Sequence, residues 1–228
     1  MTLSDEQETR AYCKPYQLII FDWEGTLGDP LGHVHEALKT GAAAAGLSQY
    51  DAACARKYVA LGLDKAVRKI FPGLTLYRYE RLLSAVQQAL VSLHHVVYLF
   101  DGASACIQKI HDAGIQLAIA TNKGQQSLER ALDAVALRPF FRITRSAGLL
   151  PAKPSPDMLI EILTETGFAP HEALMIGDSV SDIEMANALG VASIGVDFYY
   201  QQVDDLKHAG AIAVFHDFSQ VEAYLGLD

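Results

Sequence analysis

The sequence predicts an α/β fold, in which helices flank a parallel β-sheet and an all-helical unit is inserted near the start of the chain. Beyond residue 100, short apolar runs alternate with helix-like patterns, which is typical of βαβ units and a parallel sheet. Between residues 30 and 99 the patterns are helical throughout. We therefore expect a core made of residues 1–29 and 100–228, with residues 30–99 forming a helical lid over the active end of the sheet.

The first strand and the inserted helices follow from apolar runs and from the residues that interrupt them. Gln17–Phe21 is almost entirely apolar, as expected for a strand buried on both faces, and Met1–Lys14 before it reads as a loose leader. Glycine and proline then divide the helical unit. Its expected helices are His33–Gly46, Asp51–Leu61, Asp64–Phe71 and Leu76–Leu93.

The rest of the core is an alternation of strands and helices. The expected strands are Ile115–Ala120, Phe141–Thr144, Ala173–Ile176, Ala192–Val196 and Ala211–Phe215. The expected helices are Ser104–Ala113, Ser127–Ala136, Pro156–Thr166, Ser181–Leu189 and Phe218–Leu225, with one more between the last two strands. Parallel strands need such crossover connections, so this order of elements supports a parallel sheet.

The composition narrows the function classes. The 228 residues carry a formal net charge of -9, which is the wrong sign for a non-specific nucleic-acid binder. The first residues are polar and acidic, unlike a signal peptide, and no apolar run reaches the roughly 20 residues of a membrane span. Three widely spaced cysteines, Cys13, Cys54 and Cys106, favour reduced thiols. We expect a cytoplasmic protein that binds neither nucleic acid nor membranes.

Polar side chains follow three of the predicted strands. Asp22 ends the first strand, Thr121 and Asn122 end the second, and Asp178 ends a later one, with Asp182 close behind it. In an open parallel sheet, ligands bind beyond the carboxyl ends of the strands, so residues far apart in sequence converge on one crevice. A proline-rich loop, residues 151–156, stiffens the backbone around Lys153, and we expect it to direct the ammonium group to the same place.

These side chains suit phosphoryl transfer. A carboxylate can attack phosphorus and form an acyl phosphate, which splits hydrolysis into two steps. Attack by one anion on another needs charge neutralisation, which Mg²⁺ held by Asp22, Asp178 and Asp182 would supply. Lys153 adds a fixed positive charge. The Thr121 hydroxyl and the backbone N–H groups of its turn can hold phosphoryl oxygens.

Four motifs occur in order along the chain, at Asp22–Thr26, Thr121–Asn122, Lys153–Pro156 and Gly177–Asp182. They match DxDGT, a hydroxyl residue after an apolar strand, a lysine often in KPxP, and GDSxxD. Through these motifs the chain resembles the haloacid dehalogenase superfamily phosphatases of the phosphoglycolate phosphatase-like branch. One such motif alone would be weak evidence, but four at these spacings are specific. The resemblance implies a Rossmann-like core, with residues 30–99 as a helical C1 cap.

The resemblance also implies roles for the acidic residues. Asp22 would be the catalytic nucleophile and a Mg²⁺ ligand. Asp178 and the main-chain carbonyl of Glu24 would be further ligands, and the carbonyl does not depend on the glutamate side chain. Asp182 would hold the metal's water shell or orient Lys153.

The remaining matched residues would act on the phosphate. Lys153 would be both catalytic and phosphate-binding, because its charge faces the phosphate and the nucleophile. Thr121 and Asn122 would bind phosphate oxygens. Thr26 fits a loop-bracing hydroxyl better than a reacting group.

Glu24 is where the sequence departs from the family pattern, which has a second aspartate there. In the family that aspartate protonates the leaving alkoxide and then activates water. Glutamate has nearly the same intrinsic pKa, but its extra methylene moves the carboxyl by roughly an ångström, and such a displacement can cost ~100-fold in rate. A slower enzyme, a specialised substrate geometry and a weakly active or non-catalytic relative all stay open at this point.

Two basic residues of the helical unit are candidates for substrate specificity. Lys65 and Arg68 lie in residues 62–68, a segment that resembles the loop by which the family's caps reach the substrate. They would meet a second anionic group of the substrate. An ordinary solvated helix face explains them equally well.

The predicted function is that of a Mg²⁺-dependent phosphatase, which hydrolyses a small, phosphoglycolate-like phosphorylated metabolite through an aspartyl-phosphate on Asp22. A phosphomutase of the β-phosphoglucomutase type shares the cap and the motifs, and a phosphate-binding relative with vestigial catalysis would also keep them. A dehalogenase is disfavoured, because the full set of metal-binding acids is superfluous there. The expected partner is a small-molecule phosphate ester, and the expected state is a monomer or homodimer.

Overall fold

The structure, a computed structural model, describes residues 16–47, 50–93 and 96–227. Its centre is a six-stranded sheet with parallel pairing throughout, in the order β3-β2-β1-β4-β5-β6. The strands are β1 (Leu18–Phe21), β2 (Gln116–Thr121), β3 (Ile143–Ser146), β4 (Ala173–Gly177), β5 (Ala192–Val196) and β6 (Val214–Phe215). The predicted α/β fold class is confirmed. The predicted leader, Met1–Lys14, lies outside the described residues, as does Cys13.

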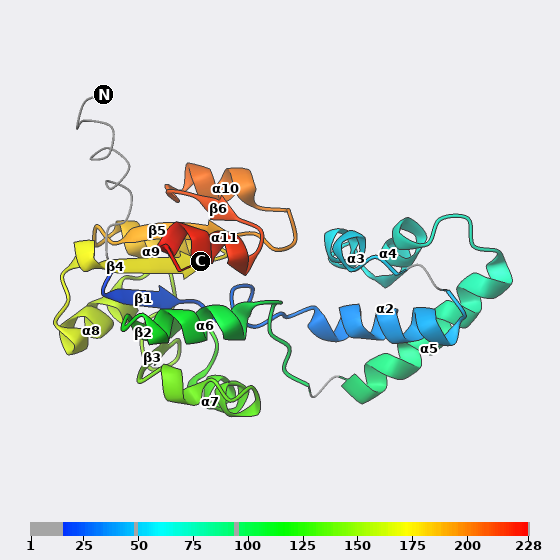
Figure 1. The fold of residues 1–228 in the computed structure, drawn as a ribbon, viewed down its shortest axis with the longest axis horizontal. Coiled ribbons are helices and arrows are strands. Elements are labelled where there is room, and N and C mark those ends of the chain that lie inside the picture. Colours follow the sequence, from blue (N-terminus) through cyan, green and yellow to red (C-terminus); the bar gives the residue numbers. More distant parts are fainter. Residues whose placement is uncertain (1–15, 48–49, 94–95, 228) are drawn as a thin grey trace, which may run out of the picture.

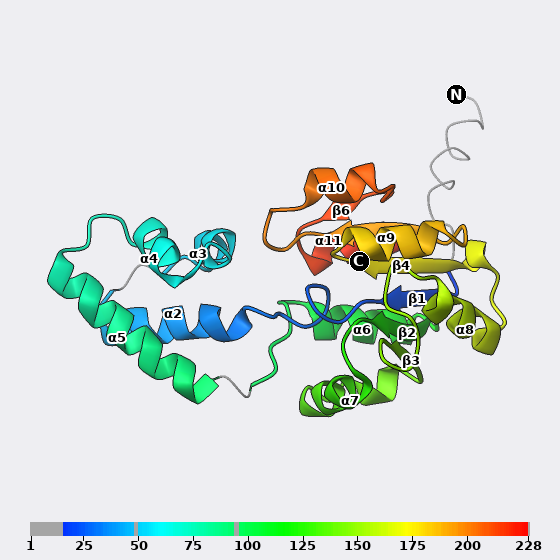
Figure 2. The ribbon, with the colours of Figure 1, turned by 180° about the vertical axis from the view of Figure 1, so that it is seen from behind.

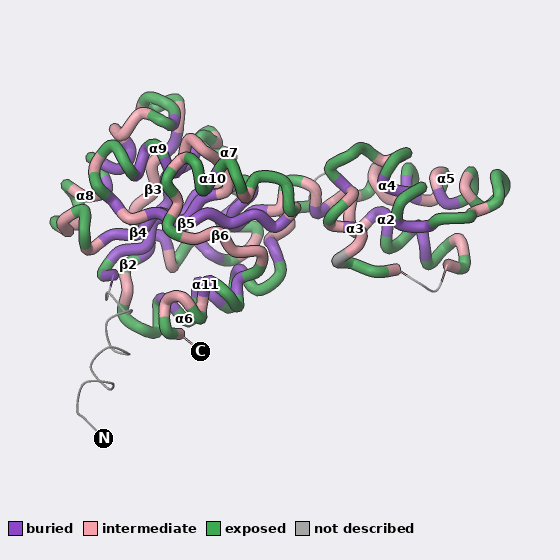
Figure 3. Tube along the Cα trace, turned by 90° about the horizontal axis from the view of Figure 1, so that it is seen from above, coloured by how far each residue is buried: buried purple, intermediate pink, exposed green. Residues whose placement is uncertain are grey.

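Helices cover both faces of this sheet (Figure 1). Ile19 and Phe21 of β1 belong to the hydrophobic cluster that contains α6 (Ala103–Asp112), α7 (Gln125–Ala134) and α11 (Phe218–Leu225). Leu18 and Ile20 belong to the opposite cluster, with α8 (Asp157–Thr166) and α9 (Val180–Asn187). The alternation explains why β1 is apolar at every position, and Figure 3 shows the strands as the buried centre. No helix in the described part of the chain is long and apolar enough to cross a membrane.

Four helices lie where the inserted helical unit is predicted. They are α2 (Gly32–Ala44), α3 (Ala52–Val59), α4 (Leu63–Ile70) and α5 (Leu76–Leu93). They pack around a hydrophobic cluster of their own, which includes Leu38, Val67, Leu82 and Val86. Gly41 allows α2 and α5 to approach closely, because a Cβ there would lie 2.5 Å from Val86 Cγ2. Figure 2 shows these helices set apart from the sheet.

Two chain segments join these helices to the sheet. They run side by side, with the Asp29 N–H donating to the Tyr98 carbonyl at 2.9 Å. The Tyr199 hydroxyl, from the loop after β5, donates to the Asp29 carboxylate. Arg56 of α3 forms a 2.8 Å ion pair with Asp101. The position of the helical unit is therefore set by contacts as well as by the chain connections.

The structure shifts two predicted strands. β3 begins at Ile143 rather than Phe141, because residues 138–140 form a 3₁₀ turn and the Phe141 N–H still bonds back to the Arg138 carbonyl at 3.2 Å. β6 is shorter than the predicted Ala211–Phe215, although the Ile212 N–H already donates to the Ser193 carbonyl at 2.9 Å. Two short helices complete the core: α10 (Val203–His208), and a 3₁₀ turn at Pro170–Glu172 before β4.

Candidate active site

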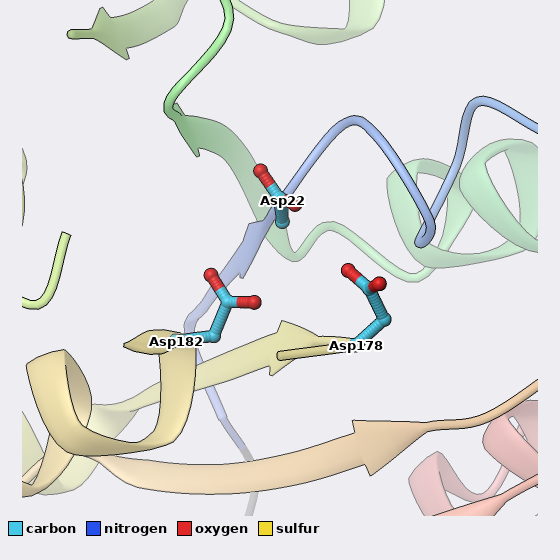
Figure 4. Close-up of side chains that lie close together, drawn as sticks. All are labelled: Asp22, Asp178 and Asp182. Carbon is cyan, nitrogen blue, oxygen red and sulfur yellow. The ribbon is translucent and has the colours of Figure 1, made fainter. Parts of the chain in front are cut away.

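Three aspartates converge at the carboxyl end of the sheet. Asp22 directly follows β1, Asp178 directly follows β4, and Asp182 lies in the first turn of α9. One carboxylate oxygen from each lies within 4.8 Å of those of the other two. Figure 4 shows the three side chains gathered around one space. The geometry follows from topology, since β1 and β4 are parallel neighbours and end at the same edge.

Lys153 is the cation of this cluster. Its side chain is 2 % exposed, and its Nζ donates to Asp182 Oδ1 at 2.6 Å. The same Nζ lies 2.6 Å from Asp22 Oδ1, in an ion pair without hydrogen-bond alignment. Asp182 is held from behind, because its Oδ2 accepts hydrogen bonds from the Ser179 N–H at 3.1 Å and the Ser179 hydroxyl at 2.6 Å. Asp182 thus contacts Lys153 directly, and its predicted role, to hold the metal's water shell or to orient Lys153, stays a prediction.

Burial and the short distances between the acids make it unfavourable to keep all three carboxyl groups ionised. Burial raises the pKa of Asp22 to about 6, against the opposing charge of Lys153. Burial, with the charges of Asp22 and Asp182, raises the pKa of Asp178 to about 7. Burial opposes the charge of Lys153, but Asp22 and Asp182 outweigh it and raise the lysine pKa. One ammonium group thus lies among three acids, so a further positive charge at this site would be favourable.

The donor set suits a hard divalent cation. All its donors are carboxylate oxygens, which are the ligands that Mg²⁺ prefers. Asp22 Oδ1 is a buried oxygen with no aligned hydrogen-bond donor among the described residues, so it can accept a further positive partner. The excess of three acids over one lysine also favours the binding of a cation. The role of the Glu24 main-chain carbonyl as a metal ligand stays a prediction.

A tight turn after Asp22 shapes one wall of the site. The N–H groups of Leu27 and Gly28 both donate to the Trp23 carbonyl, at 3.0 and 2.7 Å. Gly25 has a φ of +85°, and a Cβ there would lie 2.0 Å from Asp178 Oδ2. Only glycine lets the turn pass this close to the aspartate. The fully buried Thr26 donates to Asp178 Oδ1 at 3.3 Å, and its predicted bracing role stays a prediction.

The turn after β2 brings Thr121 and Asn122 to the same edge. Thr121 is buried, and its hydroxyl oxygen accepts a hydrogen bond from the Lys123 N–H at 3.2 Å. The Asn122 carboxamide oxygen accepts from the Lys153 N–H at 2.9 Å, so Asn122 braces the lysine loop. Sequence reasoning did not find this bracing contact, because it links two loops that are 31 residues apart. Phosphate binding by Thr121 and Asn122 stays a prediction.

Glu24 lies in the turn after β1, but outside the aspartate cluster. Its side chain is 57 % exposed, and Oε1 accepts a hydrogen bond from Lys123 Nζ at 2.6 Å. Both residues line a hollow of about 650 Å³ beside the turn, together with Trp23, His33 and Arg130. Sequence reasoning gave Lys123 no role. The available signal was a cation directly following the predicted phosphate-binding pair Thr121–Asn122.

Lys65 and Arg68 lie on α4 of the helical unit and not among the aspartates. Arg68 Nε donates to Asp64 at 3.1 Å, and its guanidinium lies over the Tyr79 ring, 4.5 Å from the centroid. The Arg68 side chain is 63 % exposed, and Lys65 is exposed too. In this arrangement Arg68 pairs within its own unit, and a specificity role for either residue stays a prediction.

Comparison of the sequence with known proteins finds related hydrolases. Residues 19–196 match the sequence profile of haloacid dehalogenase-like hydrolases. The chain is 31% identical over 206 residues to a phosphoglycolate phosphatase of Mesorhizobium japonicum, covering 87% of this chain and 91% of that protein. It is 28% identical over 218 residues to the phosphoglycolate phosphatase of Rhodospirillum rubrum, covering 91% and 90% of the two chains.

Solved structures share the fold. A predicted phosphoglycolate phosphatase from Haemophilus somnus matches with a TM-score of 0.61 at 21% identity, over 92% of this chain and 97% of that one. CbbY from Rhodobacter sphaeroides, solved in complex with phosphate, matches with a TM-score of 0.59 at 23% identity, over 92% and 99% of the two chains. Both likenesses extend over nearly the whole chain, the inserted helices included.

Proposed function

The chain belongs to the haloacid dehalogenase-like hydrolase family, and from this premise we propose that it is a Mg²⁺-dependent phosphatase of small phosphorylated metabolites. One observation carries the proposal. A buried carboxylate, Asp22, stands at the end of β1 with an ammonium group 2.6 Å away and two further carboxylates beside it. That combination suits a nucleophile that must attack an anionic phosphate ester.

In the first step, an oxygen of Asp22 attacks phosphorus and the bond to the leaving oxygen breaks. The products are an aspartyl-phosphate and an alcohol, which takes its proton from the Glu24 carboxyl. In the second step, water attacks the aspartyl-phosphate, Glu24 recovers a proton from that water, and inorganic phosphate leaves Asp22. The Lys153 ammonium group would reduce the repulsion between the Asp22 carboxylate and the phosphate. The hydroxyl of Thr121 would donate a hydrogen bond to a phosphoryl oxygen.

Asp22, Asp178 and the carbonyl of Glu24 would hold Mg²⁺, and Asp182 would support that arrangement through Lys153. When bound, the metal supplies the positive charge that lets two anions approach each other. We assign residues 30–99 to the cap that covers the site and selects the substrate. Lys65 and Arg68 are candidates for that selection.

Phosphoglycolate is the first substrate to test, because proteins up to 31% identical bear the name phosphoglycolate phosphatase. The assay measures inorganic phosphate released from phosphoglycolate and from a panel of phosphorylated metabolites, with Mg²⁺ and with EDTA. We expect release with Mg²⁺ only, and its loss in Asp22→Asn. Full activity in Asp22→Asn would refute the mechanism.

A matched control is Asp197→Asn. Asp197 is also a buried aspartate at the end of a strand, β5, but its carboxylate caps the N–H groups of Gln201 and Gln202, at 2.9 and 2.8 Å, and does not join the cluster. We expect it to keep activity. Isomerised sugar phosphate in place of free phosphate would favour a phosphomutase. Phosphate binding without turnover of any ester would favour a non-catalytic relative.

A further inference from the structure

The ion pair between Glu24 and Lys123 links two turns that the sequence separates by 99 residues. At 2.6 Å it is a short, charge-assisted contact, and Lys123 is the better buried partner, with 22 % of its side chain exposed. No second hydrogen bond to the Glu24 carboxylate is present among the described residues. The position of this carboxylate therefore depends on one lysine.

Lys123 is itself fixed to the predicted phosphate-binding turn. Its N–H donates to the hydroxyl oxygen of Thr121, which is buried at the end of β2. The Thr121 carbonyl accepts a hydrogen bond from the Ala147 N–H at 2.9 Å, which ties this turn to the end of β3. Lys123 therefore connects the end of β2, through its own N–H, to the Glu24 carboxylate, through its ammonium group.

We propose that Lys123 is a positioning residue, which holds the Glu24 carboxyl at the place where the leaving oxygen departs. The inference rests on the proposed function and deepens it. A glutamate has one more rotatable bond than the family's aspartate, so an unrestrained carboxyl would spend less time in reach of the leaving oxygen. The ion pair restricts that freedom, and it explains how a longer side chain serves at this position.

The proposal concerns the proton that passes from Oε2 of the protonated Glu24 carboxyl to the leaving oxygen as the phosphorus–oxygen bond breaks, while the Lys123 ammonium donates to Oε1. An alkyl alcohol leaves poorly without this proton, whereas p-nitrophenolate leaves readily as an anion. The two kinds of ester therefore separate a role through Glu24 from a role in holding the phosphate, which both share.

The experiment compares Lys123→Met with Lys123→Arg and wild type on the best alkyl phosphate found in the panel and on p-nitrophenyl phosphate. For Lys123→Met we expect kcat on the alkyl ester to fall by about 10- to 100-fold with KM within about twofold, and kcat on the aryl ester to change by less than about threefold. Lys123→Arg keeps the charge and should restore most of the loss. Lys207→Met, which removes an exposed lysine on α10, is the control for loss of charge.

A double-mutant cycle tests whether Lys123 acts through Glu24. We expect Lys123→Met to have no further effect in a Glu24→Gln background. Equal losses in both backgrounds, a rise in KM on both esters, or unchanged activity in Lys123→Met would each overturn the proposal. Any of these would leave the phosphatase function standing, whereas a wild-type protein that hydrolyses no ester would overturn both.

A second measurement does not need turnover. Reductive ¹³C-methylation keeps the charge of lysines and makes each one visible by NMR, and Lys123→Arg identifies the Lys123 signal by its loss. We expect Glu24→Gln to shift that signal and the exposed control Glu161→Gln to leave it in place. An unmoved Lys123 signal in Glu24→Gln would show that the pair does not form and would refute the proposal.

Discussion

At the scale of single residues, the candidate site is a balance between buried acids and one buried lysine. Asp22, Asp178 and Asp182 repel one another, and Lys153 offsets only part of this repulsion. The fold keeps these charges together although a buried charge without a partner is costly. Such a cost, concentrated at one end of the sheet, is typical of functional sites.

The raised pKa values predict how metal-free stability depends on pH. Between the unfolded value of 3.8 and the folded values of about 6 for Asp22 and about 7 for Asp178, the folded state binds more protons than the unfolded chain. Stability from this pair therefore falls as the pH rises from about 4 to about 7. In EDTA, we expect Tm to fall less steeply over this range in Asp178→Asn than in wild type. Equal slopes would contradict the shifts.

A second prediction concerns the loss of the positive charge. Replacing Lys153 leaves the three buried acids without their ammonium partner. At about pH 8, above the raised pKa values of Asp22 and Asp178, we expect Lys153→Met to lower the free energy of unfolding by about 3–5 kcal/mol in EDTA. Urea denaturation followed by circular dichroism measures the change. Lys207→Met, an exposed lysine, should change it by no more than about 0.5 kcal/mol. A similarly small effect at Lys153 would show that the buried ion pairs are not formed.

At the scale of elements, the turn between β1 and α2 positions acids that lie on other strands. Its closest approach is at Gly25, where the backbone passes against Asp178. Local sequence predicts a turn here, from glycine and the neighbouring polar residues. The requirement for glycine comes from β4, which lies beside β1 in the sheet and carries Asp178 at its end. A turn residue thereby becomes part of the site.

Gly25→Ala tests this contact against a matched glycine. Gly46 also has a positive φ, +70° against +85°, but a Cβ there would meet nothing within 4 Å. Both substitutions add comparable backbone strain, of about 1–2 kcal/mol. Only Gly25→Ala should also displace the Asp178 carboxylate and reduce the rise in Tm that Mg²⁺ produces. An unchanged Mg²⁺ effect in Gly25→Ala would contradict this placement of Asp178.

At the scale of the whole molecule, the hydrophobic clusters divide the chain into a sheet-based part and a helical part. Among the described residues, the Arg56–Asp101 ion pair links the two parts, and Tyr199 packs against the hydrophobic clusters of both. Separate hydrophobic clusters favour local unfolding of one part without the other. They also suit a cap that opens to admit substrate.

Gly41→Val tests the independence of the helical part. The added side chain would collide with Val86 of α5 and push α2 away, an overpacking that typically costs about 1–3 kcal/mol. We expect faster hydrogen exchange in α2 and α5 and unchanged exchange in β1 and β4. Ala43→Val places the same side chain at an exposed site on α2 and should have a small effect. Equal acceleration in the strands would show one cooperative unit.

Sequence patterns alone predict the inserted helices, the family and the strands, apart from the starts of β3 and β6, because apolar periodicity and motif spacing are local properties of the chain. They also predict that Asp22, Thr121, Lys153 and Asp178 meet, since parallel strands end at one edge of the sheet. Only the tertiary structure decides how side chains pair across that edge. Glu24 turns to Lys123, and the Asn122 carboxamide turns to the Lys153 N–H. Such choices depend on which groups lie opposite one another after packing, and no spacing along the chain encodes them.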